Sequence, residues 1–585
     1  MRVALVGAEL EENLGVRYMA SALEAAAHEV HIVPFNSAAD IADATRSTVD
    51  FDPRIVGLSM VFTNRGREFC DLAANLRGEG YRGYLIAGGP FASFNAERLL
   101  QDYPAFDAVG LGEGEDLMCA VAAGVDDVSH IPGLCYRTAA GGVVTNPGSG
   151  FAADLDRLAF PKRTTFYRYF GTTIASVLSS RGCWRNCAFC SINAWYERTG
   201  AGGDKFRVRS VDNLVREMKD LYFTHGIRVF NFQDDNFFLP RPSQSLRRFE
   251  ALRGSLEKEG VKGIAIAVKA RPDSIDRGNI EVLDGLGIFR VFLGVENASE
   301  RGLQNLNRKC TRDDVLKALT VLNDFDLHVA FNLLMFEPET TLEDILINLE
   351  FMEAHVENPL NFCRAEVHAG TPLEEKLRRE NALLGDYFGY DYRIKDPRAN
   401  AFHQISNLAF FDRNFDDAGL HYFNMQVDFF YQLLRRFYPG VLTQSLRAAV
   451  KNFVKRTNLD TYEGLCQIYD FVASVDPKDR TTIYGFANDV RRRIDERSLR
   501  LKKDGEAILK WMEIAYERRL APCADAAAPV LLENAGRHIE PARGGESDAV
   551  RLGIPDPLGV ITEPIPYTVF KKQLTAISDE PEVGV

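Results

Sequence analysis

Short apolar runs alternate with helical patterns from the N-terminus to about residue 138. Runs of this length, each followed by a helical stretch, are typical of a parallel sheet with helices on both faces. The pattern therefore predicts a doubly wound, Rossmann-like α/β domain over residues 1–138. Its predicted strands are residues 3–6, 30–33, 55–60, 84–87 and 108–111.

A second alternating series follows a connector at residues 139–172, which is polar and rich in Gly and Pro. Six apolar runs separated by helical patterns predict a partial (β/α)6 TIM barrel over residues 173–397. Active-site groups in such barrels gather at the C-terminal ends of the strands. The predicted strands are residues 173–179, 229–232, 264–268, 289–294, 329–334 and 362–367.

Residues 398–520 have a helical and markedly aromatic pattern and are predicted to form a helical C-terminal domain. We favour a packed apolar core for these aromatics, since aromatic side chains at helical spacing usually pack together. The alternative is a roof over the barrel mouth that shapes a substrate pocket. Residues 521–585 are rich in Ala, Pro and Gly at first and are predicted to be an extended tail.

Composition and net charge limit which classes of protein fit the sequence. The 585 residues are 46% hydrophobic and 26% charged, as in ordinary globular proteins of several domains. The net charge of −13 argues against a nucleic-acid-binding protein. The sequence shows no signal peptide and no run of about 18 apolar residues, so no membrane span is predicted. The ten cysteines lack the spacing of a disulfide framework, which indicates a cytoplasmic protein.

Three of these cysteines carry the strongest chemical signal. Cys183, Cys187 and Cys190 form a CxxxCxxC motif directly after the first predicted barrel strand. Three thiolates on a short arc can hold a 4Fe-4S cluster that leaves one iron without a cysteine. A structural zinc site is the alternative, but zinc needs a fourth ligand, and residues 191–224 contain no Cys or His.

The motif, with Phe189 before its last cysteine, resembles the signature of the radical S-adenosylmethionine (SAM) enzymes. The resemblance implies that the open iron binds the amino and carboxylate groups of SAM and that Phe189 lies near the adenine. It also implies cofactor-binding roles for polar residues at later strand ends, although helix capping or surface ion pairs would explain some of them equally well. These candidates are Gln233, Asp234 and Asp235 for the SAM amino group, Lys269 or Arg271 for its carboxylate, Glu296 for the ribose hydroxyls, and the weaker candidate Asn332.

The N-terminal region resembles the cobalamin-binding domain that precedes many radical SAM cores, through residues 13–24, 86–90 and 109–115. The Asp-x-His-x-x-Gly motif that supplies a lower cobalt ligand in other cobalamin proteins is missing. Each glycine turn, taken alone, is more often an ordinary tight turn. The candidate cobalamin-binding residues are Ser59, Thr63, Asn64, Arg65, Gly88, Gly89, Gly112, Glu113 and Gly114, with Thr63, Asn64 or Arg65 nearest the lower face.

Together these features predict a cobalamin-dependent radical SAM enzyme. The leading hypothesis is a C-methyltransferase that acts on an unactivated carbon of a small metabolite, a natural-product intermediate or a peptide, with flavodoxin or ferredoxin as electron donor. The alternatives are another cobalamin-assisted radical rearrangement, a cobalamin-binding sensor or scaffold, and non-radical methyl transfer resembling tryptophan 2-C-methyltransferase. In that last case Asp273 is a candidate ligand for the iron that no cysteine binds. His368, Cys310 and Cys363 are interpreted as structural residues.

Overall fold

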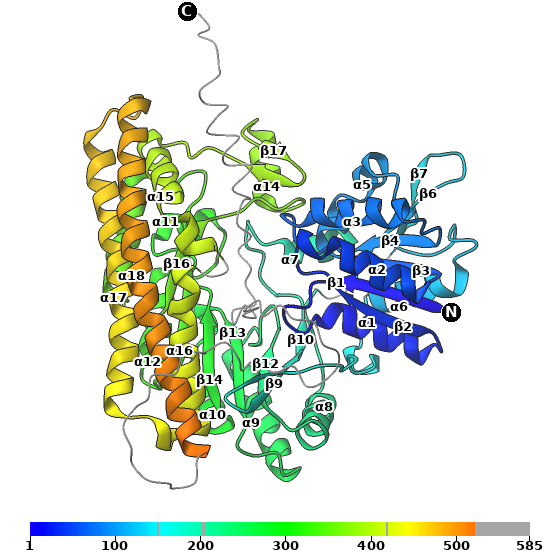
Figure 1. The fold of residues 1–585 in the computed structure, drawn as a ribbon, viewed down its shortest axis with the longest axis horizontal. Helices are drawn as coiled ribbons and strands as arrows, with labels where there is room; N and C mark the ends of the chain where they lie inside the picture. The colour runs from blue at the N-terminus through cyan, green and yellow to red at the C-terminus, as the bar shows by residue number, and fades with distance from the viewer. Residues whose placement is uncertain (149–150, 200–204, 417–418, 521–585) are drawn as a thin grey trace, which may run out of the picture.

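A computed structural model describes residues 1–148, 151–199, 205–416 and 419–520. The N-terminal α/β domain, a second α/β domain and a long helical bundle lie side by side in that order (Figure 1). The predicted tail at residues 521–585 lies outside the described residues. Among the described helices, none is both long and apolar enough to cross a membrane.

The N-terminal domain is a seven-stranded sheet of order β2-β1-β3-β4-β5-β6-β7, in which the first five strands are parallel. Helices cover both of its faces and enclose two separate apolar cores, which confirms the predicted doubly wound fold. The strands are β1 (Arg2–Gly7), β2 (Glu29–Pro34), β3 (Ile55–Ser59), β4 (Tyr84–Gly88), β5 (Ala108–Gly110), β6 (Leu134–Arg137) and β7 (Val143–Thr145). The helices are α1 (Leu14–Ala25), α2 (Ile41–Phe51), α3 (Gly66–Gly78), α4 (Pro90–Phe94), α5 (Ala96–Asp102) and α6 (Gly114–Gly124).

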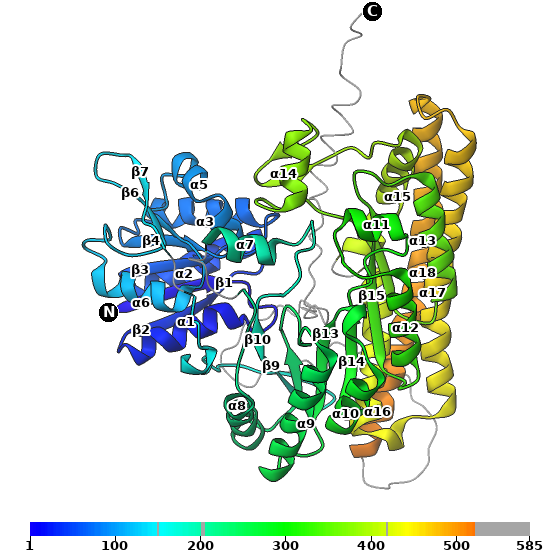
Figure 2. The same ribbon diagram turned by 180° about the vertical axis from the view of Figure 1, so that it is seen from behind.

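The second sheet has the order β16-β15-β14-β13-β12-β9-β8 and curls into an open half-barrel (Figure 2). Six of its strands are parallel, as predicted, and β8 adds an antiparallel edge. The strands are β8 (Tyr167–Tyr169), β9 (Thr172–Val177), β12 (Ile227–Phe232), β13 (Ala265–Ala270), β14 (Ile288–Leu293), β15 (His328–Phe336) and β16 (Leu360–Arg364). Two antiparallel strand pairs accompany it: β10 (Ser180–Arg181) with β11 (Arg207–Val208), and the hairpin of β17 (Leu384–Asp386) and β18 (Gly389–Asp391).

Helices pack on the outer face of the half-barrel through its largest apolar cluster. The segment predicted as a connector supplies β7 to the first sheet and β8 to the second, because short edge strands carry no long apolar run. The helices are α7 (Ser191–Thr199), α8 (Val211–Thr224), α9 (Pro242–Lys258), α10 (Arg277–Leu286), α11 (Glu300–Asn305), α12 (Arg312–Asn323), α13 (Leu342–Ala354) and α14 (Pro372–Arg379). Short 3₁₀ helices span Ala38–Asp40, Leu155–Arg157, Pro272–Ser274 and Pro439–Val441.

The C-terminal bundle consists of α15 (Pro397–Phe415), α16 (Leu420–Phe437), α17 (Gln444–Ser474) and α18 (Arg480–Leu520). Helix α16 lies against the inner face of the half-barrel, where Met425 packs on Phe292 and Ala330. Further along the same helix, Phe429 packs against residues of β12, β13 and β14. The helical domain therefore covers the inner face of the half-barrel, which the helices of the second α/β domain leave uncovered.

Candidate active site between the two α/β domains

The motif cysteines lie in the loop that joins β10 to α7, directly after Gly182. Gly182 has φ +80°, and a Cβ at this position would lie 1.7 Å from the carbonyl oxygen of Lys205. Its backbone N–H donates a 3.0 Å hydrogen bond to the Asp235 carboxylate. Only glycine fits here, so the start of the loop is fixed against the end of strand β12.

Cys187 is buried between two arginines that donate to its sulfur. Arg308 Nη1 lies 3.2 Å from Cys187 Sγ, and Arg271 Nη1 lies 3.5 Å from it. Two cationic donors aimed at one sulfur suit a thiolate, the form of cysteine that binds iron. Among the described residues, no three Cys, His, Asp or Glu side chains converge on a single metal ion; a 4Fe-4S cluster instead takes its thiolates on different irons.

The other two cysteines lie in the same loop, and burial raises the pKa of both Cys183 and Cys190. Their thiols therefore keep their protons until a metal displaces them. Cluster assembly would release these protons. The residues present thus fit an iron–sulfur cluster in this loop.

Arg308 is a site residue that the sequence did not reveal. Burial lowers its pKa, but the charges of Cys187 and Glu296 outweigh burial and raise it, which keeps the guanidinium protonated. It follows α11 in the polar run Asn307-Arg308-Lys309, whose first and third residues have left-handed φ angles of 51° and 54°. A polar turn of this kind usually indicates a solvated loop, so the pattern hid a buried cation.

Asp273 does not stand free to ligate iron. Its Oδ1 lies 2.9 Å from Arg271 Nε, and its Oδ2 lies 2.6 Å from Arg185 Nη2. Both carboxylate oxygens are thus held by arginines. The geometry gives Asp273 a structural role, orienting the arginine that faces Cys187.

Polar side chains at the ends of β12, β13, β14 and β15 come together near the cluster loop. Lys269 Nζ lies 3.4 Å from Gln233 Oε1. Glu296 adopts φ +65°, its N–H donates to the Asn332 carbonyl at 3.1 Å, and its Oε1 lies 3.7 Å from Arg308 Nη2. Burial raises the pKa of Glu296, and the side-chain oxygen of buried Asn332 has no hydrogen-bond partner among the described residues. These side chains offer donors and acceptors of both charges to a polar ligand.

The two neighbouring aspartates of the predicted site have different surroundings. Asp234 is fully buried and accepts hydrogen bonds from Ser179 N–H, Ser179 Oγ at 2.6 Å and Ser180 Oγ at 2.5 Å, so it fixes the exit from β9. Asp235 faces Gly182 and Lys269; burial raises its pKa, and the charge of Lys269 opposes that rise. Phe189 is half-buried against the half-barrel core.

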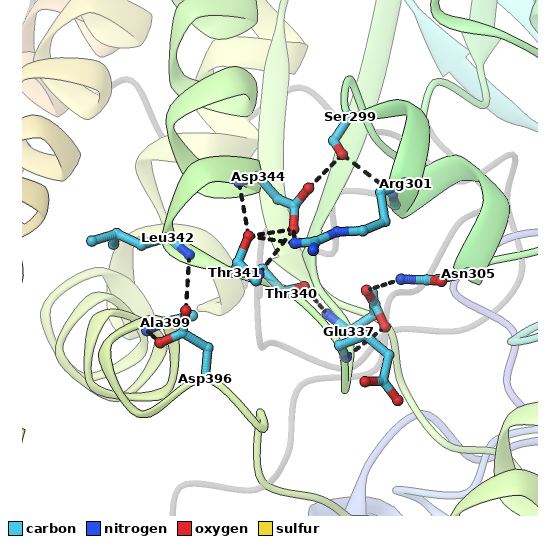
Figure 3. A network of polar contacts seen from close by, with 12 residues as sticks. Ser299, Arg301, Asn305, Glu337, Thr340, Thr341, Leu342, Asp344, Asp396 and Ala399 are labelled. Atoms are coloured by element: carbon cyan, nitrogen blue, oxygen red, sulfur yellow. Dashed lines mark hydrogen bonds and ion pairs between the residues drawn. The ribbon is translucent and has the colours of Figure 1, made fainter.

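A polar network stiffens the loops that follow β14 and β15 (Figure 3). Asp344 accepts hydrogen bonds from Ser299 Oγ at 2.6 Å and from Arg301. Asn297, next to Glu296, donates to the carbonyl oxygen of Leu334 at 2.9 Å. The network thereby holds Glu296 and its unusual backbone angle in place.

The facing edge of the N-terminal domain is formed by the ends of β3, β4 and β5. Ser59 pairs with Gly88 across two strands. Gly89 has φ +95°, and a Cβ there would lie 2.8 Å from the carbonyl oxygen of Met60. These glycines place no side chain at the end of β4, where a large flat ligand such as cobalamin could approach the backbone closely. Thr63 and Asn64 precede α3, and Arg65 is tied to Glu68 and to the carbonyl oxygen of Phe35.

Glu113, predicted as a cobalamin contact, joins the two α/β domains. It lies between Gly112 and Gly114, and its side chain is buried. Its Oε1 lies 2.6 Å from Arg207 Nη2 and 3.3 Å from Arg181 Nη1. Arg207 and Arg181 belong to the paired strands β11 and β10, so this carboxylate anchors the strand from which the cluster loop starts.

A second group of ion pairs joins the loop after β1 to the half-barrel. Glu12 binds Arg163 at 2.8 Å and accepts the backbone N–H of Ser176 at 2.6 Å. Glu11 accepts a 2.8 Å hydrogen bond from Gln233 Nε2. The N-terminal domain is therefore attached at both the cluster loop and the strand ends.

Of the remaining candidates, Cys310 and Cys363 are buried and His368 is half-buried. Burial raises the pKa of Cys310 and Cys363 and lowers the pKa of His368 to about 4, so the histidine is neutral at physiological pH. The geometry gives none of the three an ionic role.

Two known protein families match parts of the chain. The B12 binding domain family matches residues 3–122, and the Radical SAM superfamily matches residues 177–352. The chain is a radical SAM protein with a B12-binding domain. The predicted cofactors, a 4Fe-4S cluster, SAM and cobalamin, are those of these two families, and the radical SAM domain identifies an enzyme that needs a reductant.

Relatives of this radical SAM protein span much of its length. An uncharacterized methyltransferase of Pyrococcus horikoshii is 26% identical over 381 residues, covering 63% of this chain and 79% of the relative. The hopanoid C-3 methylase of Methylococcus capsulatus is 26% identical over 334 residues, covering 55% and 61%. The structure resembles that of the cobalamin-dependent SAM radical enzyme OxsB with aqua-cobalamin bound, with a TM-score of 0.63 at 16% identity over 88% of this chain and 80% of OxsB. This confirms the predicted fold.

Proposed function

We propose that this radical SAM protein is a cobalamin-dependent C-methyltransferase acting on an unactivated carbon of a small metabolite, a natural-product intermediate or a peptide. The observation that carries the proposal is the pair of ionic attachments made by Glu113 and Glu12. These contacts support a site in which the proposed cobalamin-binding edge, the cysteine loop and the polar strand ends lie close together. The names of the relatives, a methyltransferase and a methylase, agree with this assignment.

Each part of the site has a role in this proposal. Cys183, Cys187 and Cys190 would hold the cluster, and Lys269, Glu296 and Asn332 would bind SAM beside it. The strand-end residues Ser59, Gly88 and Gly89 would support cobalamin. When bound, SAM and the cluster supply hydrogen abstraction from carbon, and cobalamin supplies the methyl group. The chain's own contribution is to orient these groups in one place from which water is excluded.

The electron donor proposed is a flavodoxin or a ferredoxin in the reducing cytoplasm. Free thiols on both α/β domains, including buried Cys70 and Cys363, agree with that compartment. A low-potential one-electron donor is the kind of reductant that an iron–sulfur centre requires.

Product analysis tests the proposal. Protein purified and reconstituted without oxygen, then incubated with SAM, cobalamin and dithionite, is expected to form 5′-deoxyadenosine. S-adenosylhomocysteine without 5′-deoxyadenosine would instead indicate polar methyl transfer, and the absence of both would indicate a sensor or scaffold. Because Cys119 packs against an apolar core of the N-terminal domain, a Cys119→Ala variant serves as a cysteine-substitution control and should behave like the wild type.

A further inference from the structure

The loop between β1 and α1 of the N-terminal domain places Glu11 at the strand ends of the half-barrel. Glu11 Oε2 accepts a 2.8 Å hydrogen bond from Gln233 Nε2, which lies 222 positions further along the chain. The other end of the same amide, Gln233 Oε1, lies 3.4 Å from Lys269 Nζ. A carboxylate of one domain is thus connected through a single amide to a cation of the other.

The loop that carries Glu11 is attached to the half-barrel on both sides of this residue. Glu12 accepts the backbone N–H of Ser176 at 2.6 Å, and the Tyr167 hydroxyl donates to the carbonyl oxygen of Glu9 at 2.8 Å. Because these contacts hold the backbone before and after Glu11, its carboxylate has a defined position.

The carboxylate of Glu11 decides which way the Gln233 amide points. A carboxylate only accepts hydrogen bonds, whereas an ammonium group only donates them. With Nε2 turned to Glu11, the amide oxygen faces Lys269; the reverse orientation would oppose two acceptors at one end and two donors at the other. The backbone N–H of Gln233 also donates to the carbonyl oxygen of Val177 at 2.9 Å, which fixes the start of the side chain.

Of the two cations predicted for the SAM carboxylate, Lys269 has the position that suits this role. Arg271 directs Nε to Asp273 at 2.9 Å and Nη1 to the sulfur of Cys187 at 3.5 Å, so it serves the cysteine loop. Lys269 lies on β13, and its charge acts on Asp235, just after the neighbouring strand β12. A cation beside a carboxylate suits the zwitterionic end of an amino acid, such as the methionine portion of SAM.

We infer that Glu11 is a positioning residue for SAM, an inference that rests on the proposed function. By holding the Gln233 amide, Glu11 sets the ammonium group of Lys269 where it binds the SAM carboxylate. Strand β1 ends at the same edge of the N-terminal sheet as β3 and β4, where cobalamin is proposed to bind. The affinity for SAM would therefore depend on the domain that holds the second cofactor.

Decarboxylated SAM keeps the adenosyl, sulfonium and amino groups and lacks the carboxylate, so it is the matched ligand. Equilibrium dialysis measures both ligands on full-length protein reconstituted with cluster and cobalamin, without reductant. Lys269→Met is expected to weaken SAM binding by about 10- to 100-fold, the effect of losing a charged hydrogen bond, and to leave decarboxylated SAM unchanged. Glu11→Ala should weaken SAM alone by about 3- to 10-fold, because Lys269 keeps its charge but loses its fixed position. Glu11→Gln keeps an oxygen that accepts from Gln233 and should retain most of the affinity.

Tyr167→Phe is the control for domain attachment. It removes the hydrogen bond from the half-barrel to Glu9 in the same loop and should leave the ratio of the two affinities unchanged. A wild-type ratio in Glu11→Ala or in Lys269→Met, whether both ligands bind normally or both bind more weakly, would overturn the inference. Because binding is measured without turnover, a protein that shows the expected pattern but forms no 5′-deoxyadenosine would contradict the proposed function and still support the role of Glu11.

Discussion

Replacing Cys187 with alanine is expected to remove the cluster and all cleavage of SAM. Two thiolates cannot hold a 4Fe-4S centre, so iron content should fall from about four atoms per chain to less than about one. The change also leaves the guanidinium groups of Arg271 and Arg308 facing a methyl group instead of the Cys187 sulfur. Loss of these charged contacts should destabilise the protein by about 1–3 kcal/mol.

Iron analysis, the visible absorbance of the cluster and 5′-deoxyadenosine formation measure this outcome. The matched variant Cys119→Ala removes a half-buried thiol in α6 and should keep all three signals. A Cys187→Ala protein that retains its iron and still cleaves SAM would show that the cluster is bound elsewhere.

Replacing Glu113 with alanine should cause the largest loss of stability outside the cysteine loop. The carboxylate is buried against Arg207 and Arg181, and its removal leaves the buried Arg207 without a carboxylate partner, whereas Arg181 keeps Glu115 at 2.5 Å. Removing one partner of a buried ion pair typically costs about 3–5 kcal/mol. Because Arg181 immediately precedes Gly182, we also expect the cluster to assemble less completely.

Urea unfolding and iron content should be measured together for this variant. Glu79→Ala removes an exposed glutamate of the same domain and is the control, with an expected change within about 0.5 kcal/mol. An unchanged free energy of unfolding in Glu113→Ala would contradict the role assigned to this ion pair.

The same carboxylate gives stability a pH dependence. Burial raises the pKa of Glu113, but hydrogen bonds and charge from Arg207 and Arg181 outweigh burial and hold it below its ordinary value of 4.5. A carboxyl group whose pKa is lowered in the folded state contributes its full stabilisation at a pH above its ordinary pKa. That contribution is lost as the pH falls through the lowered pKa. Wild-type protein should therefore lose more stability than Glu113→Ala on acidification below pH 4.5.

The sequence revealed those parts of the molecule that depend on local patterns. Apolar runs located the parallel strands of both sheets, and the CxxxCxxC spacing located the cysteine loop, because strands and metal motifs are encoded over a few neighbouring residues. Strand ends could be named as candidate site positions because parallel strands share a carboxyl edge.

Contacts between residues distant in the chain could not be predicted in this way. Arg308 reaches Cys187 across 121 positions, and Glu113 reaches Arg207 across 94. The β17–β18 hairpin gives a third example: the ring of Phe388 packs against that of Phe91 in the N-terminal domain, with centroids 5.5 Å apart. No local pattern distinguishes such partners from surface charges or ordinary core aromatics.

Mössbauer spectroscopy of protein reconstituted with isotopically enriched iron tests the central claim most directly. The account predicts a 4Fe-4S cluster in which one iron lacks a cysteine ligand, so that adding SAM changes the Mössbauer signal of that iron alone. A cluster whose irons all remain unaffected by SAM, or a protein that takes up zinc in place of iron, would contradict it.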